Sequence, residues 1–168
     1  MKKVLKLFSA DENFVRPFLK EKNRLEKILD QEIFIEHVGS TAVPGLGGKG
    51  IIDVAIGVKG KSSLQPVACE LIKAGYFADL DNKTPADRIF LSSREHDSTL
   101  GDYHLHIVVM NGDEWRRLIY FRDQLRTDKK LRNEYMSLKR RLLVETKADR
   151  EKYRKLKNDF IQKVLKEL

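Results

Sequence analysis

The chain has 168 residues, 41% of them hydrophobic and 35% charged, with a formal net charge of +8. This length suits one domain that buries a substantial core. No apolar run approaches the roughly 20 residues of a membrane helix, and residues 1–8 lack the cleavage site of a secretory signal. We therefore expect a cytoplasmic protein that does not span a membrane. The single Cys69 excludes an internal disulfide, and its apolar neighbours predict a buried, inert thiol in a helix.

Hydrophobic periodicity predicts a sheet followed by a helical part. In chain order, we expect a helix at about 10–30, strands at 33–38 and 51–58, a helix at 62–74, strands at 88–91 and 103–110, and three helices whose apolar stripes include Leu118, Leu138 and Leu156. This pattern indicates one α+β domain over residues 1–168. Its small mixed sheet and flanking helices occupy about 10–110, and a C-terminal helical bundle occupies about 112–168.

A glycine-rich segment joins the first two expected strands and is the most informative part of the chain. It reads His-Val-Gly-Ser-Thr-Ala-Val-Pro-Gly-Leu-Gly-Gly-Lys-Gly over residues 37–50, and the strand after it carries Asp53. Glycine lets backbone N–H groups approach a phosphate closely, and a strand carboxylate can hold a divalent cation against that phosphate. The candidate phosphate-binding residues are Gly39, Ser40, Lys49 and, from a later strand, Arg88.

Two familiar nucleotide-binding motifs do not fit this loop. Its glycines satisfy the G-x-G-x-x-G spacing, but dinucleotide-binding proteins need them to open a helix, and here a strand follows. A Walker A loop needs Ser or Thr after Lys49, where the chain has Gly50, and Gly in place of Val43. A glycine-rich turn without a ligand is the remaining alternative.

Two histidines and one aspartate form a second candidate group. His104 and His106 lie two apart on one expected strand, so they share a face, and Asp53 would share that face if the strands are neighbours. We expect these three residues to be catalytic and to bind a divalent metal (Mg, Mn or Zn), with His37 as a further contributor from a third strand. Imidazole suits Zn or Mn better than Mg. The alternative is an electrostatic role, with imidazole N–H groups directed at phosphate.

The sequence of residues 37–46 resembles that of the GrpB-like family, which is placed in the nucleotidyltransferase superfamily of the DNA polymerase beta type. Further matching positions are His104, His106, residues 121–126, Tyr135, Leu138, Lys139, Lys157, Phe160 and Ile161. The resemblance implies a nucleotidyltransferase-like fold, with Gly39 and Ser40 at a nucleoside triphosphate and Asp53 at the metal. The wider superfamily carries a second carboxylate two residues further on, where this chain has Ala55, and a third on a neighbouring strand, where His104 or His106 stands.

These features favour a metal-dependent nucleotidyltransferase that acts on a nucleoside triphosphate and an unidentified acceptor. The alternative is a catalytically deficient nucleotide- or nucleic-acid-binding protein on the same fold, and a third option is a transition-metal hydrolase. Residues 116–168 hold 18 Lys and Arg against 8 Asp and Glu, which raises nucleic acid as a partner. We do not favour it, because charge on amphipathic helices is usually a solvated face. A small-molecule nucleotide is the expected partner.

Overall fold

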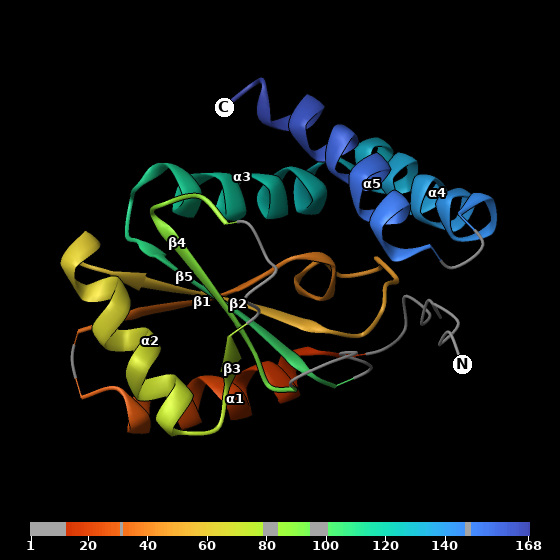
Figure 1. Ribbon diagram of the computed structural model, residues 1–168. Helices are drawn as coiled ribbons and strands as arrows, with labels where there is room; N and C mark the ends of the chain where they lie inside the picture. The colour runs from red at the N-terminus through yellow and green to blue at the C-terminus, as the bar shows by residue number, and fades with distance from the viewer. Residues whose placement is uncertain (1–12, 31, 79–83, 95–100, 147–148) are drawn as a thin grey trace.

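The computed structural model describes residues 13–30, 32–78, 84–94, 101–146 and 149–168 (Figure 1). The elements, in chain order, are α1 (Val15–Ile28), β1 (Phe34–Val38), the 3-10 turn η1 (Ser40–Ala42), β2 (Ile52–Val58), η2 (Lys61–Ser63), α2 (Leu64–Lys73), β3 (Phe77–Ala78), β4 (Arg88–Ser92), β5 (Tyr103–Val109), α3 (Asp113–Thr127), α4 (Lys129–Glu145) and α5 (Arg150–Leu165). The predicted strands and helices are confirmed, and the two-residue β3 was not predicted. The first helix begins at Val15 rather than near residue 10, and residues 10–12 lie outside the described part.

The five strands form one mixed sheet in the order β1-β2-β5-β4-β3. Strands β2 and β5 are parallel neighbours, and the other pairs are antiparallel. The chain between β2 and β5 includes α2, which lies against the sheet (Figure 1). The parallel pairing sets Asp53 beside His104 and Ala55 beside His106. The expected α+β class with a small mixed sheet and flanking helices is therefore confirmed.

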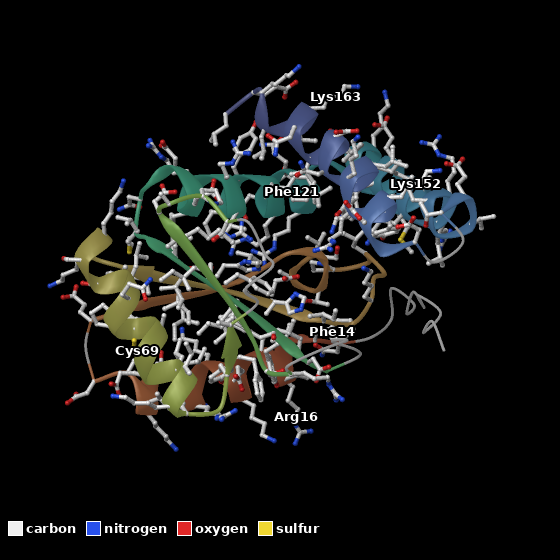
Figure 2. The ribbon with its side chains drawn as sticks, viewed as in Figure 1. Phe14, Arg16, Cys69, Phe121, Lys152 and Lys163 are labelled. Carbon is white, nitrogen blue, oxygen red and sulfur yellow. The ribbon has the colours of Figure 1, made fainter. Side chains whose placement is uncertain are left out.

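Helices α1 and α2 cover one face of the sheet. The core there includes Leu25 and Leu71 from the helices and Ile107 from β5, all three with no exposed surface. The prediction that Cys69 is buried is wrong, because its side chain is exposed on α2 (Figure 2). The buried side chains of this helix include Ala68 and Leu71, and at 100° per residue position 69 turns out of that apolar stripe.

The C-terminal helices lie on the opposite face (Figure 1). Trp115 of α3 packs with Ala55 and Val108 of the sheet. Phe121 of α3 and Tyr135 of α4 pack with residues of the glycine-rich loop and of α5, namely Val43, Leu46 and Val164. The helical part is therefore docked on the loop that the sequence marked as a phosphate site. None of the described helices combines the length and the apolar character that crossing a bilayer requires.

Replacing Gly57 by Ala should lower the free energy of unfolding by about 1–3 kcal/mol, because overpacking forces a rigid neighbour to move. A Cβ added at this position in β2 would lie 2.7 Å from the Trp115 ring. Chemical denaturation measures the change. Gly60→Ala is the matched control, because a Cβ there meets nothing within 4 Å. Equal effects of the two substitutions would contradict the tight contact between β2 and α3.

Candidate functional site

The Gly39-Ser40 turn lies directly on the Asp53 carboxylate. Strand β1 ends at Val38, which pairs with Asp53 of β2. Gly39 then takes φ 72° and ψ −168°, a combination essentially restricted to glycine. A Cβ on Gly39 would stand 2.4 Å from Asp53 Oδ2. The glycine therefore allows the backbone of the loop and the strand carboxylate to form one continuous surface.

Asp53, His104 and His106 lie together on one face of the sheet, as the alternation of strand residues predicted. The distance from His106 Nε2 to Asp53 Oδ1 is 3.1 Å, and that from His104 Nδ1 to the same oxygen is 3.5 Å. The side chains of Asp53 and His104 are 28% and 25% exposed, against 8% for His106. The cluster is thus reachable from solvent at the aspartate and at His104. The catalytic and metal-binding roles of these residues remain predictions.

Arg88 determines which nitrogen of His106 carries the proton. Its Nη2 lies 2.7 Å from His106 Nδ1. A guanidinium can only donate, so Nδ1 accepts and the ring proton sits on Nε2, which donates to Asp53. Burial lowers the pKa of His106 to about 4, against the opposing effect of Asp53, so the ring is neutral at pH 7. Arg88 thus orients His106 and also donates to Glu114 at 3.2 Å, and its role at a phosphate remains a prediction.

The Asp53 carboxylate is ionised in this setting. Burial opposes its charge, but the hydrogen bonds from His104 and His106 outweigh burial and hold the pKa of Asp53 well below its usual range. An ionised carboxylate that is partly exposed beside a loop is a suitable single ligand for Mg²⁺, which otherwise takes substrate phosphates and water.

A three-ligand transition-metal site does not fit the same geometry. Such a site would need the lone pair of His106 Nε2, which here carries the proton that is donated to Asp53. Among the described residues, no group of three His, Cys, Asp or Glu side chains is arranged to hold a metal ion.

His37 does not join this cluster, and the expectation that it would is wrong. It pairs with Val54 across β1 and β2, so it points to the opposite face, where its ring stacks on Phe18 at 4.6 Å. Its Nε2 lies 3.0 Å from Thr41 Oγ1, whose own proton goes to Ile51 O. Burial lowers the pKa of His37 to about 4. The neutral ring therefore donates to Thr41 Oγ1 and supports the Gly39-Ser40 turn from the face of the sheet that α1 covers.

Two arginines of α3 hold the same turn from the site face. Arg122 Nη1 donates to His37 O at 3.0 Å and to Glu36 Oε2 at 2.6 Å. Arg126 Nε donates to Ala42 O at 3.0 Å. Backbone carbonyls on both sides of Gly39-Ser40 are thus fixed by side chains, and the turn is preorganised before any ligand arrives.

Lys139 of α4 contacts Ser40, and no role for this lysine was predicted from the sequence. Its Nζ lies 3.3 Å from Ser40 Oγ, donates to Gly47 O and sits 4.9 Å from the centre of the Tyr135 ring. The residue is 2% exposed. Lys49, a predicted phosphate ligand, lies nearby with its Nζ 4.6 Å from the Tyr153 ring centre. The sequence held one signal for this buried lysine. Lys139 follows Tyr135 by four residues and so lies on the apolar stripe of a predicted helix.

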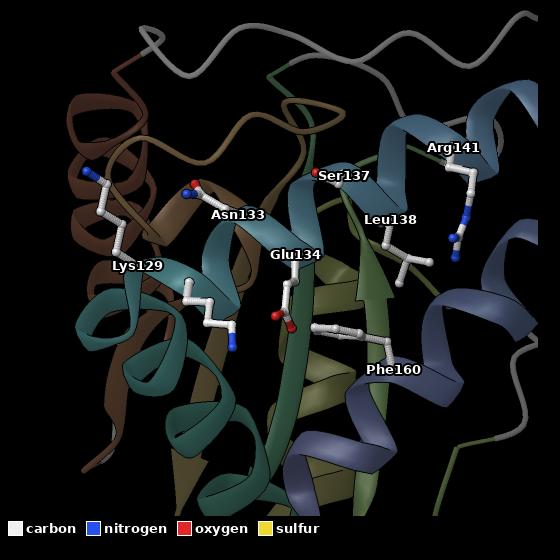
Figure 3. A pocket seen from close by; sticks show the side chains of 8 residues that line it. Lys129, Asn133, Glu134, Ser137, Leu138, Arg141 and Phe160 are labelled. Carbon is white, nitrogen blue, oxygen red and sulfur yellow. The ribbon is translucent and has the colours of Figure 1, made fainter.

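A groove of about 940 Å³ between α4 and α5 is separate from this site (Figure 3). Asn133, Ser137 and Arg141 line it at four-residue spacing along α4, and Phe160 of α5 closes one side. Lys139 is two positions from Ser137, about 200° around the helix, so it faces the loop. The groove and the Asp53 cluster therefore lie on different sides of α4.

Fold and site together define an α+β protein in which a Gly-Ser turn, preorganised by α3 and α4, rests on one strand carboxylate. The family model described as GrpB protein matches residues 4–167, so the chain belongs to the GrpB family. The glutamate-rich protein GrpB of Alkalihalophilus pseudofirmus is 32% identical, over 96% of this chain and 94% of that protein. A UPF0157 protein of Streptomyces coelicolor is 29% identical, over 92% of this chain and 79% of that protein.

One solved structure agrees with this assignment. The crystal structure of GrpB from Enterococcus faecalis matches with a TM-score of 0.80 and 28% identity, over 96% of each chain. The Cid1 poly(U) polymerase in complex with Mg and 3'-dATP matches with a TM-score of 0.46 and 13% identity, over 74% of this chain and 40% of that chain.

Proposed function

We propose that the chain binds a nucleoside triphosphate at Gly39, Ser40 and Asp53 and acts as a metal-dependent nucleotidyltransferase on an acceptor. The supporting observation is the contact between Gly39 and Asp53, where a single added carbon would lie 2.4 Å from Oδ2. A phosphate on the turn and a cation on the carboxylate would be direct neighbours there. This adjacency is what phosphoryl chemistry assisted by a cation requires.

Each residue of the cluster has a distinct part in this proposal. Asp53 would hold the divalent cation, which supplies neutralisation of phosphate charge when bound. His106 keeps the carboxylate ionised and oriented by donating to Oδ1, and His104 lies 3.5 Å from the same oxygen and acts in the same direction. The hydroxyl of Ser40 and the backbone N–H groups near Gly39 would donate to phosphate oxygens.

Asp53→Asn should abolish the dependence of nucleotide binding on Mg²⁺ or Mn²⁺, because the amide is neutral and a poor ligand for these cations. Its free energy of unfolding should fall by about 1–3 kcal/mol, since the neutral amide accepts a weaker hydrogen bond from His106 than the carboxylate does. The measurement is thermal unfolding with each nucleoside triphosphate, with and without the metals. Wild-type protein at 100 times the dissociation constant should gain about 2.7 kcal/mol.

Asp159→Asn, a substitution on the exposed part of α5, is the matched control and should behave as wild type. Normal metal-dependent binding by Asp53→Asn would remove the cation from this carboxylate and overturn the proposal.

A second function, a nucleotide-binding protein deficient in catalysis, is favoured by one observation. Ala55 occupies the place of the superfamily's second carboxylate, and it is fully buried with Val38, Val108 and Trp115. With one carboxylate in place of two, the cations that clamp the attacking and leaving phosphate oxygens would be held less firmly. In a cell extract that supplies acceptors, transfer of the labelled nucleotidyl group to an acceptor with release of pyrophosphate supports the transferase, whereas tight binding without transfer or release supports the binding protein. Nucleic acid as the ligand of that protein remains the less favoured version.

A further inference from the structure

Lys139 is a buried cation among neutral partners. Its ammonium group donates to the Gly47 carbonyl and Ser40 hydroxyl and lies over the Tyr135 ring. No carboxylate within ion-pair distance of Lys139 is found among the described residues. A buried charge without an opposite charge lowers the stability of the folded protein. A residue that is kept despite this loss of stability is a candidate for a binding role.

The charges around Lys139 increase that cost. Burial is the main cause that lowers the pKa of Lys139 to about 7, and the nearby cations Lys157, Arg140 and Lys49 contribute to the same shift. Three elements supply this positive group, namely the loop, α4 and α5. Lys139, which contacts the half-buried Ser40, is thus surrounded by further positive charge, and an anion bound there would relieve the repulsion.

Two aromatic side chains lie beside Lys139 and Lys49, and neither carries a negative charge. Tyr135 and Tyr153 are the aromatic groups against which Lys139 and Lys49 lie. Burial raises the pKa of Tyr135 well above its usual range and also raises that of Tyr153, so both phenols stay neutral. The glycine-rich loop therefore has positively charged side chains beside it that are separate from Asp53, His104 and His106.

We propose that Lys139 and Ser40, with Lys49, Lys157 and Arg140 around them, form a polyphosphate subsite that takes the terminal phosphates of the ligand. The inference rests on the proposed function for the identity of the whole ligand, but the subsite itself requires only a phosphate chain. Lys139 Nζ lies 3.3 Å from Ser40 Oγ, so its charge would act on a phosphate oxygen that accepts from the Ser40 hydroxyl. The bound anion also holds Lys139 in its charged form.

The test uses tripolyphosphate as the probe, in EDTA, with the full chain and isothermal titration calorimetry. Lys139→Met should weaken binding by about tenfold or more, as expected for loss of a hydrogen bond to a charged group. Lys155→Met removes the same charge from an exposed position on α5 and should weaken binding by less than about threefold. Titrations at pH 8 in Tris and in HEPES should show net proton uptake by wild type and less uptake by Lys139→Met.

The outcomes separate the subsite from the proposed function. Equal affinities of Lys139→Met and Lys155→Met for tripolyphosphate would overturn the subsite, even if nucleotides bind with metal through Asp53. Binding of tripolyphosphate that depends on Lys139 supports the subsite, even if no nucleotide binds and the transferase proposal fails. Absence of tripolyphosphate binding by wild type at millimolar concentration would overturn it as well.

Discussion

Gly39→Ala should lower the free energy of unfolding by about 3–4 kcal/mol and disable the site. Two costs add at this position. The backbone angles of Gly39 lie in a region that costs a non-glycine residue about 1–3 kcal/mol. The new Cβ would also stand 2.4 Å from Asp53 Oδ2, so the carboxylate or the turn must move. Urea denaturation measures the loss, and nucleotide binding should fall with it.

Gly45→Ala separates these two costs, because Gly45 has a φ of 76° but its Cβ would meet nothing within 4 Å. It should lose only about 1–2 kcal/mol, the cost of the left-handed backbone. The excess at Gly39 should shrink when Asp53 is replaced by Ala, since the collision partner is then gone. An unchanged excess in that background would show that the turn does not rest on Asp53.

Lys139→Met should raise the free energy of unfolding by about 1–3 kcal/mol at pH 7 while weakening anion binding. Met keeps the length of the side chain and removes a buried charge that has no acidic partner. Opposite effects on stability and binding are expected of a residue retained for function. Chemical denaturation at pH 6 to 9.5 measures the difference between the variant and wild type.

The pH dependence of that difference has a definite sign. The pKa of Lys139 is lowered from 10.5 to about 7 in the folded protein. Between those values the unfolded chain binds a proton that the native protein has released, so wild-type stability rises with pH. The advantage of Lys139→Met is therefore largest below pH 7 and declines by up to about 4 kcal/mol towards pH 10. An advantage that stays constant with pH would mean that Lys139 is not the group that titrates.

The sequence by itself was sufficient to predict the helices and all the strands except the two-residue β3. It was also sufficient to predict that His104 and His106 share one face of their strand. Period-two and period-3.6 patterns depend on local geometry, so the strands around Asp53 and His106 and the three C-terminal helices were predicted correctly. The alternation in β5 also placed His104 and His106 on one face. That Asp53 joins them depends on the pairing of their strand with β2, which the prediction assumed and did not derive.

Tertiary structure decided what each polar side chain contacts. His37 failed as a site residue because strand register turned it to the α1 face. Arg88 became the partner of His106 because antiparallel pairing of β4 with β5 brought the two together. Lys139 met Ser40, 99 positions away in the chain, only because α4 docks on the loop. Contacts of this kind depend on the packing of distant elements, and no local pattern of residues records that packing.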